Sequence, residues 1–106
     1  MAEEIDLIWS PEALEQLVAI FEYIAQHDLQ AAKRVSLNIA ELAEALVSTP
    51  ELGRIVPEYG RPELREQVHR PGKRSRYAFR IIYRICPGQI EIISVWHTSR
   101  GRLPEF

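Results

Sequence analysis

Cysteine is nearly absent from this sequence of 106 residues, which contains a single one, Cys86. One cysteine cannot form an intramolecular disulfide, so a reducing compartment is expected. His27, His69, His97 and Cys86 also lack the close spacing of zinc ligands. We therefore predict no metal or other cofactor, and we expect Cys86 to be an inert residue of an apolar strand.

Long apolar runs are missing as well. The first residues, MAEEID, lack the basic and apolar regions of a signal peptide, and no apolar run approaches membrane-spanning length. We therefore expect a cytoplasmic protein without a membrane partner. A hydrophobic content of 46% over 106 residues suits one compact domain, residues 1–106.

Lysine is scarce, because eleven of the thirteen basic residues are arginine. Residues 1–50 carry nine acidic and two basic residues, a balance of −7, whereas residues 51–106 carry eleven basic and six acidic residues, a balance of +5. Arginine can bind phosphate or carboxylate through two parallel hydrogen bonds. The basic half therefore suggests a phosphate-binding surface, and the alternative is a solvated face that balances the acidic half. The candidate phosphate-binding residues are Arg61, Arg65, Arg70, Lys73, Arg74, Arg76 and Arg84.

The first half of the chain predicts a strand followed by two helices. Residues 5–9, IDLIW, predict the strand, and Ser10 with Pro11 predicts the start of a helix. A second helix is expected to begin after Asp28 and to end before Pro50. Because the connection is short, the two helices should form an antiparallel hairpin against a common sheet. The apolar stripes expected to face the core are Leu14, Leu17, Val18, Phe21, Ile24 and Ala25 in the first helix, and Ala32, Val35, Ile39, Leu42 and Leu46 in the second.

The second half predicts a loop followed by a three-stranded meander. Residues 50–63 contain three prolines and two glycines, which is typical of a surface loop. The segments LREQVHR, YAFRIIYRIC and QIEIISVWH predict three antiparallel strands. Alternation in the middle strand places Phe79 and Tyr83 toward the helices, and Arg80 and Arg84 on an opposite, open face. The predicted fold class is α+β: an N-terminal strand and an antiparallel helix hairpin packed on a small sheet that the C-terminal meander completes.

Five segments carry a resemblance to a known family: WSPEALEQL, LVSTPELGR, LRE, YAFRIIYRI and VWHTSRGRLP. In this order they resemble the RelE/ParE superfamily of bacterial toxins from type II toxin–antitoxin modules, over nearly the whole chain. The long helix hairpin and TPELGR are closer to the ParE branch, whose members are associated with gyrase inhibition. The arginine in RIIYRI and the histidine that ends the last strand are closer to the RelE branch, whose members cleave mRNA in the ribosome. The paired strand lysines of the RelE pattern are absent from LREQVHR.

RNA cleavage without a metal requires a base for the 2′-hydroxyl, an acid for the leaving oxygen and a cation beside the phosphorus. Arg80 would hold the phosphate, His97 would transfer a proton, and Arg100 would make a second phosphate contact. Glu58 or Glu63 would supply the base. We expect Arg80 and His97 to project together from the open face of the meander.

Each of these two residues also has a structural alternative. In the structural alternative, the role of His97 is limited to a hydrogen bond at the end of the last strand. Arg80 then forms an ion pair with Glu66 or Glu91 across the meander. Stability alone is a poor reason for a desolvated arginine at this position, because such a pair contributes only about 0.2–1 kcal/mol.

The resemblance implies a toxin that arrests growth when its partner is lost. The expected mechanism is metal-independent mRNA cleavage on the ribosome. The alternatives are non-enzymatic poisoning of DNA gyrase, and RNA binding or assembly without catalysis. The implied partners are a short, acidic antitoxin, and either the ribosome with mRNA or gyrase. Toxin and antitoxin are expected to form a hetero-oligomer.

Overall fold

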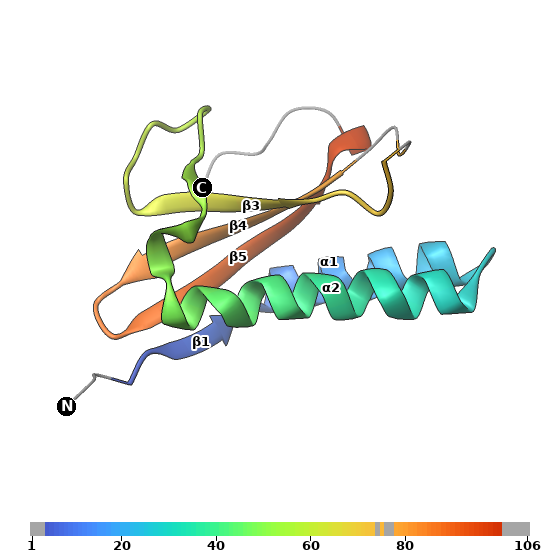
Figure 1. The fold of residues 1–106 in the computed structure, drawn as a ribbon, viewed down its shortest axis with the longest axis horizontal. Coiled ribbons are helices and arrows are strands. Elements are labelled where there is room, and N and C mark those ends of the chain that lie inside the picture. The colour runs from blue at the N-terminus through green and yellow to red at the C-terminus, as the bar shows by residue number, and fades with distance from the viewer. Residues whose placement is uncertain (1–3, 74, 76–77, 101–106) are drawn as a thin grey trace.

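Two helices pack on one face of a five-stranded sheet in the computed structural model of the protein (Figure 1). The structure describes residues 4–73, 75 and 78–100. The elements are β1 (Asp6–Trp9), α1 (Pro11–Ala25), α2 (Leu29–Ser48), η1 (Pro50–Leu52), β2 (Arg54–Ile55), β3 (Leu64–His69), β4 (Phe79–Cys86), β5 (Gln89–His97) and η2 (Thr98–Arg100), where η marks a 3₁₀ turn. The α+β class and the helix hairpin predicted from the sequence are confirmed.

The strands follow the order β1-β5-β4-β3-β2 across the sheet. The first strand pairs in parallel with the last one, whereas all other neighbours are antiparallel, which confirms the predicted meander. Residues 50–63, expected to form a loop, also contain η1 and the two-residue strand β2.

A bulge interrupts the pairing of β4 with β5. Tyr83 lies opposite Ile92 and Ile82 lies opposite Ser94, so Ile93 is an extra residue with no partner on β4. An extra residue shifts the alternation of all later side chains by one position. This shift decides on which face the end of β5 presents its side chains.

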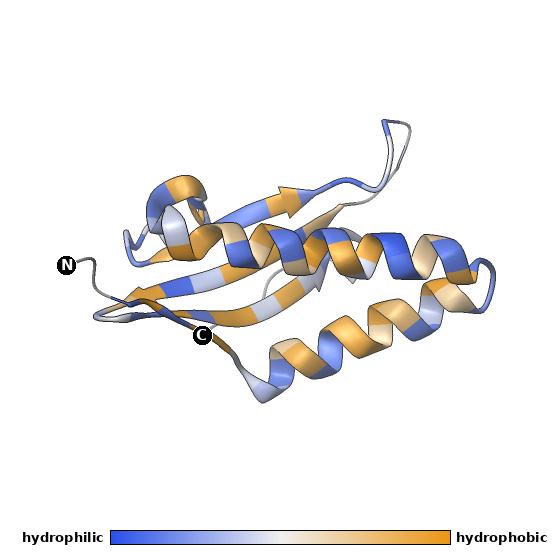
Figure 2. Cartoon of the chain, turned by 60° about the horizontal axis from the view of Figure 1, so that its bottom comes forward, coloured by the Kyte–Doolittle hydropathy of each residue, from blue (hydrophilic) through white to orange (hydrophobic). Residues whose placement is uncertain are grey.

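Both helices begin where the sequence predicts. The Ser10 side chain accepts a hydrogen bond from the Ala13 N–H at 3.0 Å, and the Asp28 side chain accepts one from the Ala31 N–H at 3.0 Å. Each bond satisfies one of the backbone N–H groups that a helix leaves without a partner in its first turn. Hydrophobic and hydrophilic residues alternate along both helices (Figure 2).

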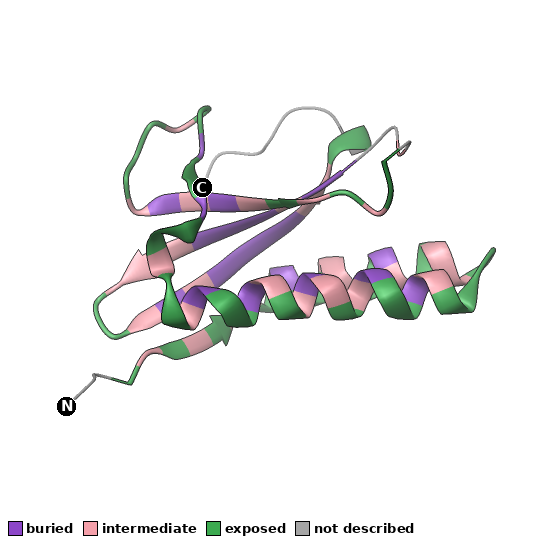
Figure 3. Ribbon diagram, in the orientation of Figure 1, coloured by how far each residue is buried: buried purple, intermediate pink, exposed green. Residues whose placement is uncertain are grey.

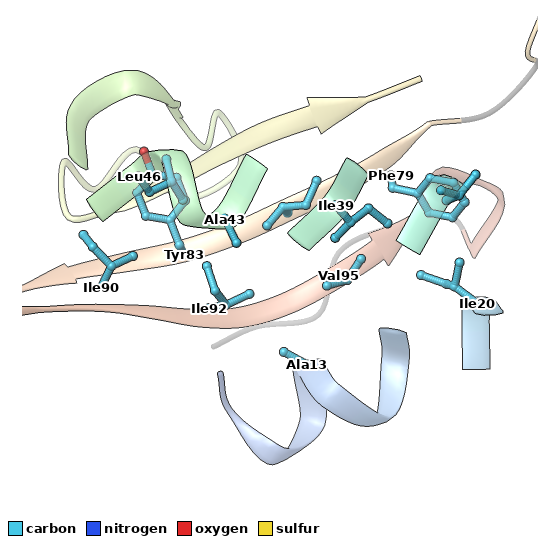
Figure 4. Close-up of a cluster of buried hydrophobic side chains, with 12 residues drawn as sticks. Ala13, Ile20, Ile39, Ala43, Leu46, Phe79, Tyr83, Ile90, Ile92 and Val95 are labelled. Atoms are coloured by element: carbon cyan, nitrogen blue, oxygen red, sulfur yellow. The ribbon is translucent and has the colours of Figure 1, made fainter. Parts of the chain in front are cut away.

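The inner core lies between the helix hairpin and the sheet, and the buried residues concentrate on β4, β5 and the sheet side of the helices (Figure 3). Phe79 and Ile20 lie at one end of this core, and Tyr83 and Leu46 lie at the other (Figure 4). The buried members of the inner core are Ala13, Ile20, Val35, Ile39, Ala43, Leu46, Phe79, Ile81, Tyr83, Ile90, Ile92 and Val95. The stripe predicted for α2 is confirmed, with Leu42 packed at its margin.

The stripe predicted for α1 is partly wrong. Leu14 and Val18 are 48% and 54% exposed, whereas Ala13 and Ile20 are the residues that this helix buries. The amide oxygen of Gln16 accepts hydrogen bonds from the Val95 N–H at 2.7 Å and from the Ser94 hydroxyl at 3.1 Å. Helix α1 therefore turns Gln16 toward β5, and Leu14 and Val18 lie on the side away from the core.

Candidate functional site

The sheet face opposite the helices is partly covered, and not open as predicted. The segment between α2 and β3 folds back over this face (Figure 1). Four buried apolar residues form a second cluster here, which we call the outer cluster: Val56, Leu64, Ile82 and Ile93. Tyr59 and Trp96 pack against it. The prolines and glycines of the segment predict a loop, but its contacts with distant strands depend on the tertiary fold.

Tyr83 and Gly53 fix the start of this covering segment. The Tyr83 hydroxyl donates a hydrogen bond to the Pro50 carbonyl at 2.6 Å and accepts one from the Gly53 N–H at 2.9 Å. A Cβ at Gly53 would lie 2.5 Å from the Glu66 carbonyl oxygen and 2.7 Å from the Tyr83 hydroxyl. Only glycine can therefore bring the backbone so close to the sheet.

Arg80 lies beside the outer cluster and binds two carboxylates. Its Nε and Nη2 donate hydrogen bonds to the Glu66 carboxylate at 2.5 and 2.7 Å. Its Nη1 and Nη2 donate to the Glu58 carboxylate at 2.6 and 2.9 Å. The Nε of Arg54 donates to Glu66 at 3.2 Å. We call these four residues the arginine–glutamate network, in which two positive and two negative charges balance.

Burial differs sharply within this network. The Glu66 side chain is fully buried and that of Arg80 is 15% exposed, whereas that of Glu58 is 44% exposed. Hydrogen bonds from Arg80 lower the pKa of Glu58 to about 2. The hydrogen bonds that Arg80 donates, first to Glu58 and second to Glu66 in size of effect, raise the pKa of Arg80 above its ordinary value. Glu58 is therefore a strongly stabilised carboxylate, and a poor general base at neutral pH.

The network matches the structural alternative for Arg80. Glu66 was one of its two expected cross-strand partners, and the other, Glu91, lies instead 3.6 Å from Arg84. Arg54 was not among the candidate residues. A sequence signal for Glu66 exists, since it lies two residues from both Leu64 and Val68 and therefore shares their face of β3, on which Val68 pairs with Arg80.

Two other candidate phosphate-binding residues, Arg61 and Arg65, also bind acceptor groups within the protein. Arg61 forms an ion pair with Glu63 at 2.7 Å. A hydrogen bond from its own backbone and one from Arg61 lower the pKa of Glu63. Arg65 donates to the carbonyl oxygens of Gly53 and Pro62 at 3.1 and 3.0 Å.

The remaining basic candidates are exposed or undescribed. Arg70 and Lys73 are exposed after β3 and form no ion pair with another described residue. Arg74, Arg76 and the side chain of Arg100 lie outside the described residues, although the Arg100 backbone ends η2.

His97 does not lie with Arg80, which contradicts the expectation that both project from one face. His97 pairs with Phe79 and its ring packs edge-to-face on the Phe79 ring, with centroids 4.9 Å apart, on the helix side of the sheet. Arg80 pairs with Trp96 on the opposite face. If Ile93 paired with Ile82 as in a regular strand, His97 would align with Ala78 and share the face of Arg80.

The His97 ring is held by the turn that follows it. Its Nδ1 accepts a hydrogen bond from the Ser99 N–H at 3.2 Å and also contacts the Ser99 hydroxyl. An accepting Nδ1 places the hydrogen of a neutral ring on Nε2. The alternative prediction, in which His97 hydrogen-bonds at the end of its strand, fits this geometry.

Neither a metal-holding group of side chains nor a membrane-spanning helix is found in the described part of the chain. Among residues 4–73, 75 and 78–100, no three His, Cys, Asp or Glu side chains gather into a group that could hold a metal ion. Within the same residues, neither helix is long and apolar enough to cross a membrane.

Comparison with known proteins gives consistent matches. The family described as "ParE toxin of type II toxin-antitoxin system, parDE" matches residues 7–102. The protein called Toxin RelE2 of Caulobacter vibrioides is 32% identical over 94 residues, which cover 89% of this chain and 96% of that protein. A solved structure titled "Chromosomal ParDE TA system from P. aeruginosa" shares the fold, with a TM-score of 0.64 and 20% identity over 89% of this chain and 96% of that one. The chain therefore belongs to the ParE toxin family, within the RelE/ParE superfamily of type II toxin–antitoxin systems.

Proposed function

We propose that this toxin arrests growth by binding its target, DNA gyrase, and not by cleaving RNA. One observation carries the proposal: the guanidinium of Arg80, the candidate phosphate clamp, already donates to both carboxylate oxygens of Glu66 and of Glu58. A phosphodiester would have to displace one of these carboxylates, and the remaining one would repel it. His97, the candidate proton donor, lies on the other face of the sheet.

Gyrase is the target that the ParE branch suggests. The family match to the ParE toxin over residues 7–102 favours this branch. The paired strand lysines of the RelE pattern are absent from LREQVHR, which also argues against the RelE mechanism of ribosomal cleavage.

Two assays separate binding from cleavage. Purified toxin should inhibit gyrase supercoiling or trap cleaved gyrase–DNA complexes, and mapping of RNA ends in cells shortly after expression should reveal no new ends. New RNA ends that appear while gyrase supercoiling is unaffected would contradict the proposal and favour the nuclease mechanism.

Glu58→Gln gives a matched genetic test. A nuclease that used Glu58 as its base would lose activity, whereas a binding toxin should arrest growth as the wild type does. Glu63→Gln is the control, because Glu63 was the alternative base and is bound to Arg61 instead of Arg80.

An antitoxin protein is the proposed regulatory partner. Exposed apolar side chains on the helix hairpin, Leu14, Val18 and Leu37, offer contacts for an amphipathic helix. We expect a short, acidic partner encoded beside the gene. Its attraction to the basic second half of the chain should give an association rate that falls as salt rises. Leu37→Asp should weaken the complex, measured by surface plasmon resonance, without changing the melting temperature. An association rate that is independent of salt would count against charge steering.

A further inference from the structure

A hollow of about 400 Å³ opens on the helix side of the sheet, away from the arginine–glutamate network. The helices and the sheet diverge toward the turn between α1 and α2 (Figure 1), and the hollow lies at this end. Ile20 and Phe79, which mark this end of the inner core in Figure 4, line its depth and are 7% and 1% exposed. A second hollow of about 370 Å³ shares Tyr23 and His97 with it and extends to Asp28. Because the two adjoining hollows share lining residues, we treat them together and call them the ring pocket.

Aromatic rings that pack against one another form part of the wall of the ring pocket. The rings of Phe79 and His97 meet edge-to-face at 4.9 Å with an interplanar angle of 65°. At the rim, Tyr23 and His27 form a second edge-to-face pair at 6.4 Å and 81°. On its far side Phe79 stacks on His69, with centroids 6.4 Å apart. Offset and edge-to-face contacts are the arrangements that aromatic rings favour, so walls of this kind can receive one more ring.

The charges around the ring pocket disfavour a phosphate-bearing ligand. None of the described side chains that line it is a lysine or arginine, and the one carboxylate among them, Asp28, is negative. Helix α1 contributes a further negative charge, Glu22, next to Tyr23 in the sequence, and it has no basic residue in its last turn. A nucleotide would therefore meet repulsion here, whereas an uncharged ring would not.

From these three features we propose that the ring pocket receives an aromatic side chain, from phenylalanine, tyrosine or tryptophan, of a partner protein. The pocket has the size of small-ligand sites, generally about 300–1,000 Å³. It leads from the 63% exposed Tyr23 down to the buried Phe79, so an inserted ring would be desolvated as an interface anchor is. The proposal does not depend on the identity of the toxin's target.

N-acetyl-tryptophan amide is a suitable neutral probe, and titration can be followed in ¹H–¹⁵N NMR spectra of the intact protein. Saturable shifts should concentrate on Tyr23, Ile24, Phe79, His97 and Ser99. Adenosine monophosphate should bind more weakly than the neutral probe. Absence of saturable shifts, shifts that map elsewhere, or tighter binding of the nucleotide would overturn the proposal.

Ala19→Phe provides the decisive variant, because Ala19 lines the hollow from an exposed helical position and a larger side chain there would fill it. It should lower the affinity for the probe by about tenfold or more. Ala45→Phe adds the same ring at an exposed position of α2 that does not line the pocket, and it should bind as the wild type does. Unchanged melting temperatures would show that both variants are folded, and equal affinities in the two would refute the assignment.

Discussion

At the scale of single residues, the Glu66 carboxylate depends most on its neighbours, because its side chain is completely buried. A buried charge is tolerated when it is paired and hydrogen-bonded, and it is costly when a partner is removed. Arg80 supplies two of its hydrogen bonds, and Arg54, whose side chain is 62% exposed, supplies one. The network is therefore a structural feature whatever the target of the toxin.

Arg80→Ala should lower the free energy of unfolding by about 3–5 kcal/mol, because Glu66 would stay buried with Arg54 as its cationic partner. Urea denaturation measures this loss. Adding Glu66→Gln should recover part of it, since the uncompensated charge is then removed. Arg84→Ala is the control on the same strand, because its pair with Glu91 is partly exposed and should contribute less than about 1 kcal/mol. Equal stability of the two single variants would contradict this view of the network.

Glu58 should make the fold sensitive to acid. Its pKa is about 2 in the folded protein and 4.5 ordinarily, so its ionised form is stabilised by folding. The contribution is present above pH 4.5 and is lost as the pH falls from about 4.5 toward 2. Melting temperatures measured across this range should fall less steeply for Glu58→Gln than for the wild type. Parallel curves for the two proteins would show that the contact with Arg80 does not stabilise the fold.

At the scale of elements, the segment between α2 and β3 is attached to the sheet at a place where only glycine fits. Gly53→Ala should destabilise the protein by about 1–3 kcal/mol, because the added methyl group would push the backbone away from Glu66 and Tyr83. Thermal denaturation measures the effect. Gly72→Ala is the matched control, since its Cβ would have nothing within 4 Å, and should be nearly neutral. A larger loss in Gly72→Ala than in Gly53→Ala would contradict the proposed packing.

Helix α2 offers a second comparison between two neighbouring positions. Ile39 is fully buried in the inner core, whereas Leu37 on the same helix is 59% exposed. Ile39→Ala should cost about 2–5 kcal/mol through lost burial and the cavity left behind. Leu37→Ala should stay within about 0.5 kcal/mol of the wild type. Chemical denaturation measures the loss in both variants. Similar losses in Leu37→Ala and Ile39→Ala would mean that Leu37 belongs to the core.

At the scale of the whole molecule, the two ends of the described chain are joined in one sheet, because β1 pairs with β5. Leu7 is partly buried against the inner core, whereas Ile8 points outward and is 42% exposed. Leu7→Asp should detach β1, expose the edge of β5 and promote aggregation. Size-exclusion chromatography and melting temperature should show this loss for Leu7→Asp and little change for Ile8→Asp. Similar behaviour of both variants would mean that β1 does not close the sheet.

The sequence by itself determined the features that depend on near neighbours in the chain. Ser10 and Asp28 cap the helices through bonds to residues three positions away, and the stripe of α2 follows the helical period. The Pro87–Gly88 turn, a dipeptide typical of turns, joins β4 to β5, with Gly88 at a φ of +73° that favours glycine. The family resemblance likewise rested on segments that the sequence displays directly.

Only the tertiary structure decided where the site residues lie relative to one another. The extra residue Ile93 in β5 moves His97 to the helix side and away from Arg80, and no local pattern announces such an insertion. The position of the Glu58 carboxylate on Arg80 depends on a loop that packs across the sheet, 22 residues away in the chain. Gln16 binds β5, and Leu14 and Val18 face outward although their spacing fits a core stripe. Each of these outcomes depends on contacts between distant segments, which exist only once the sheet and the helices have packed.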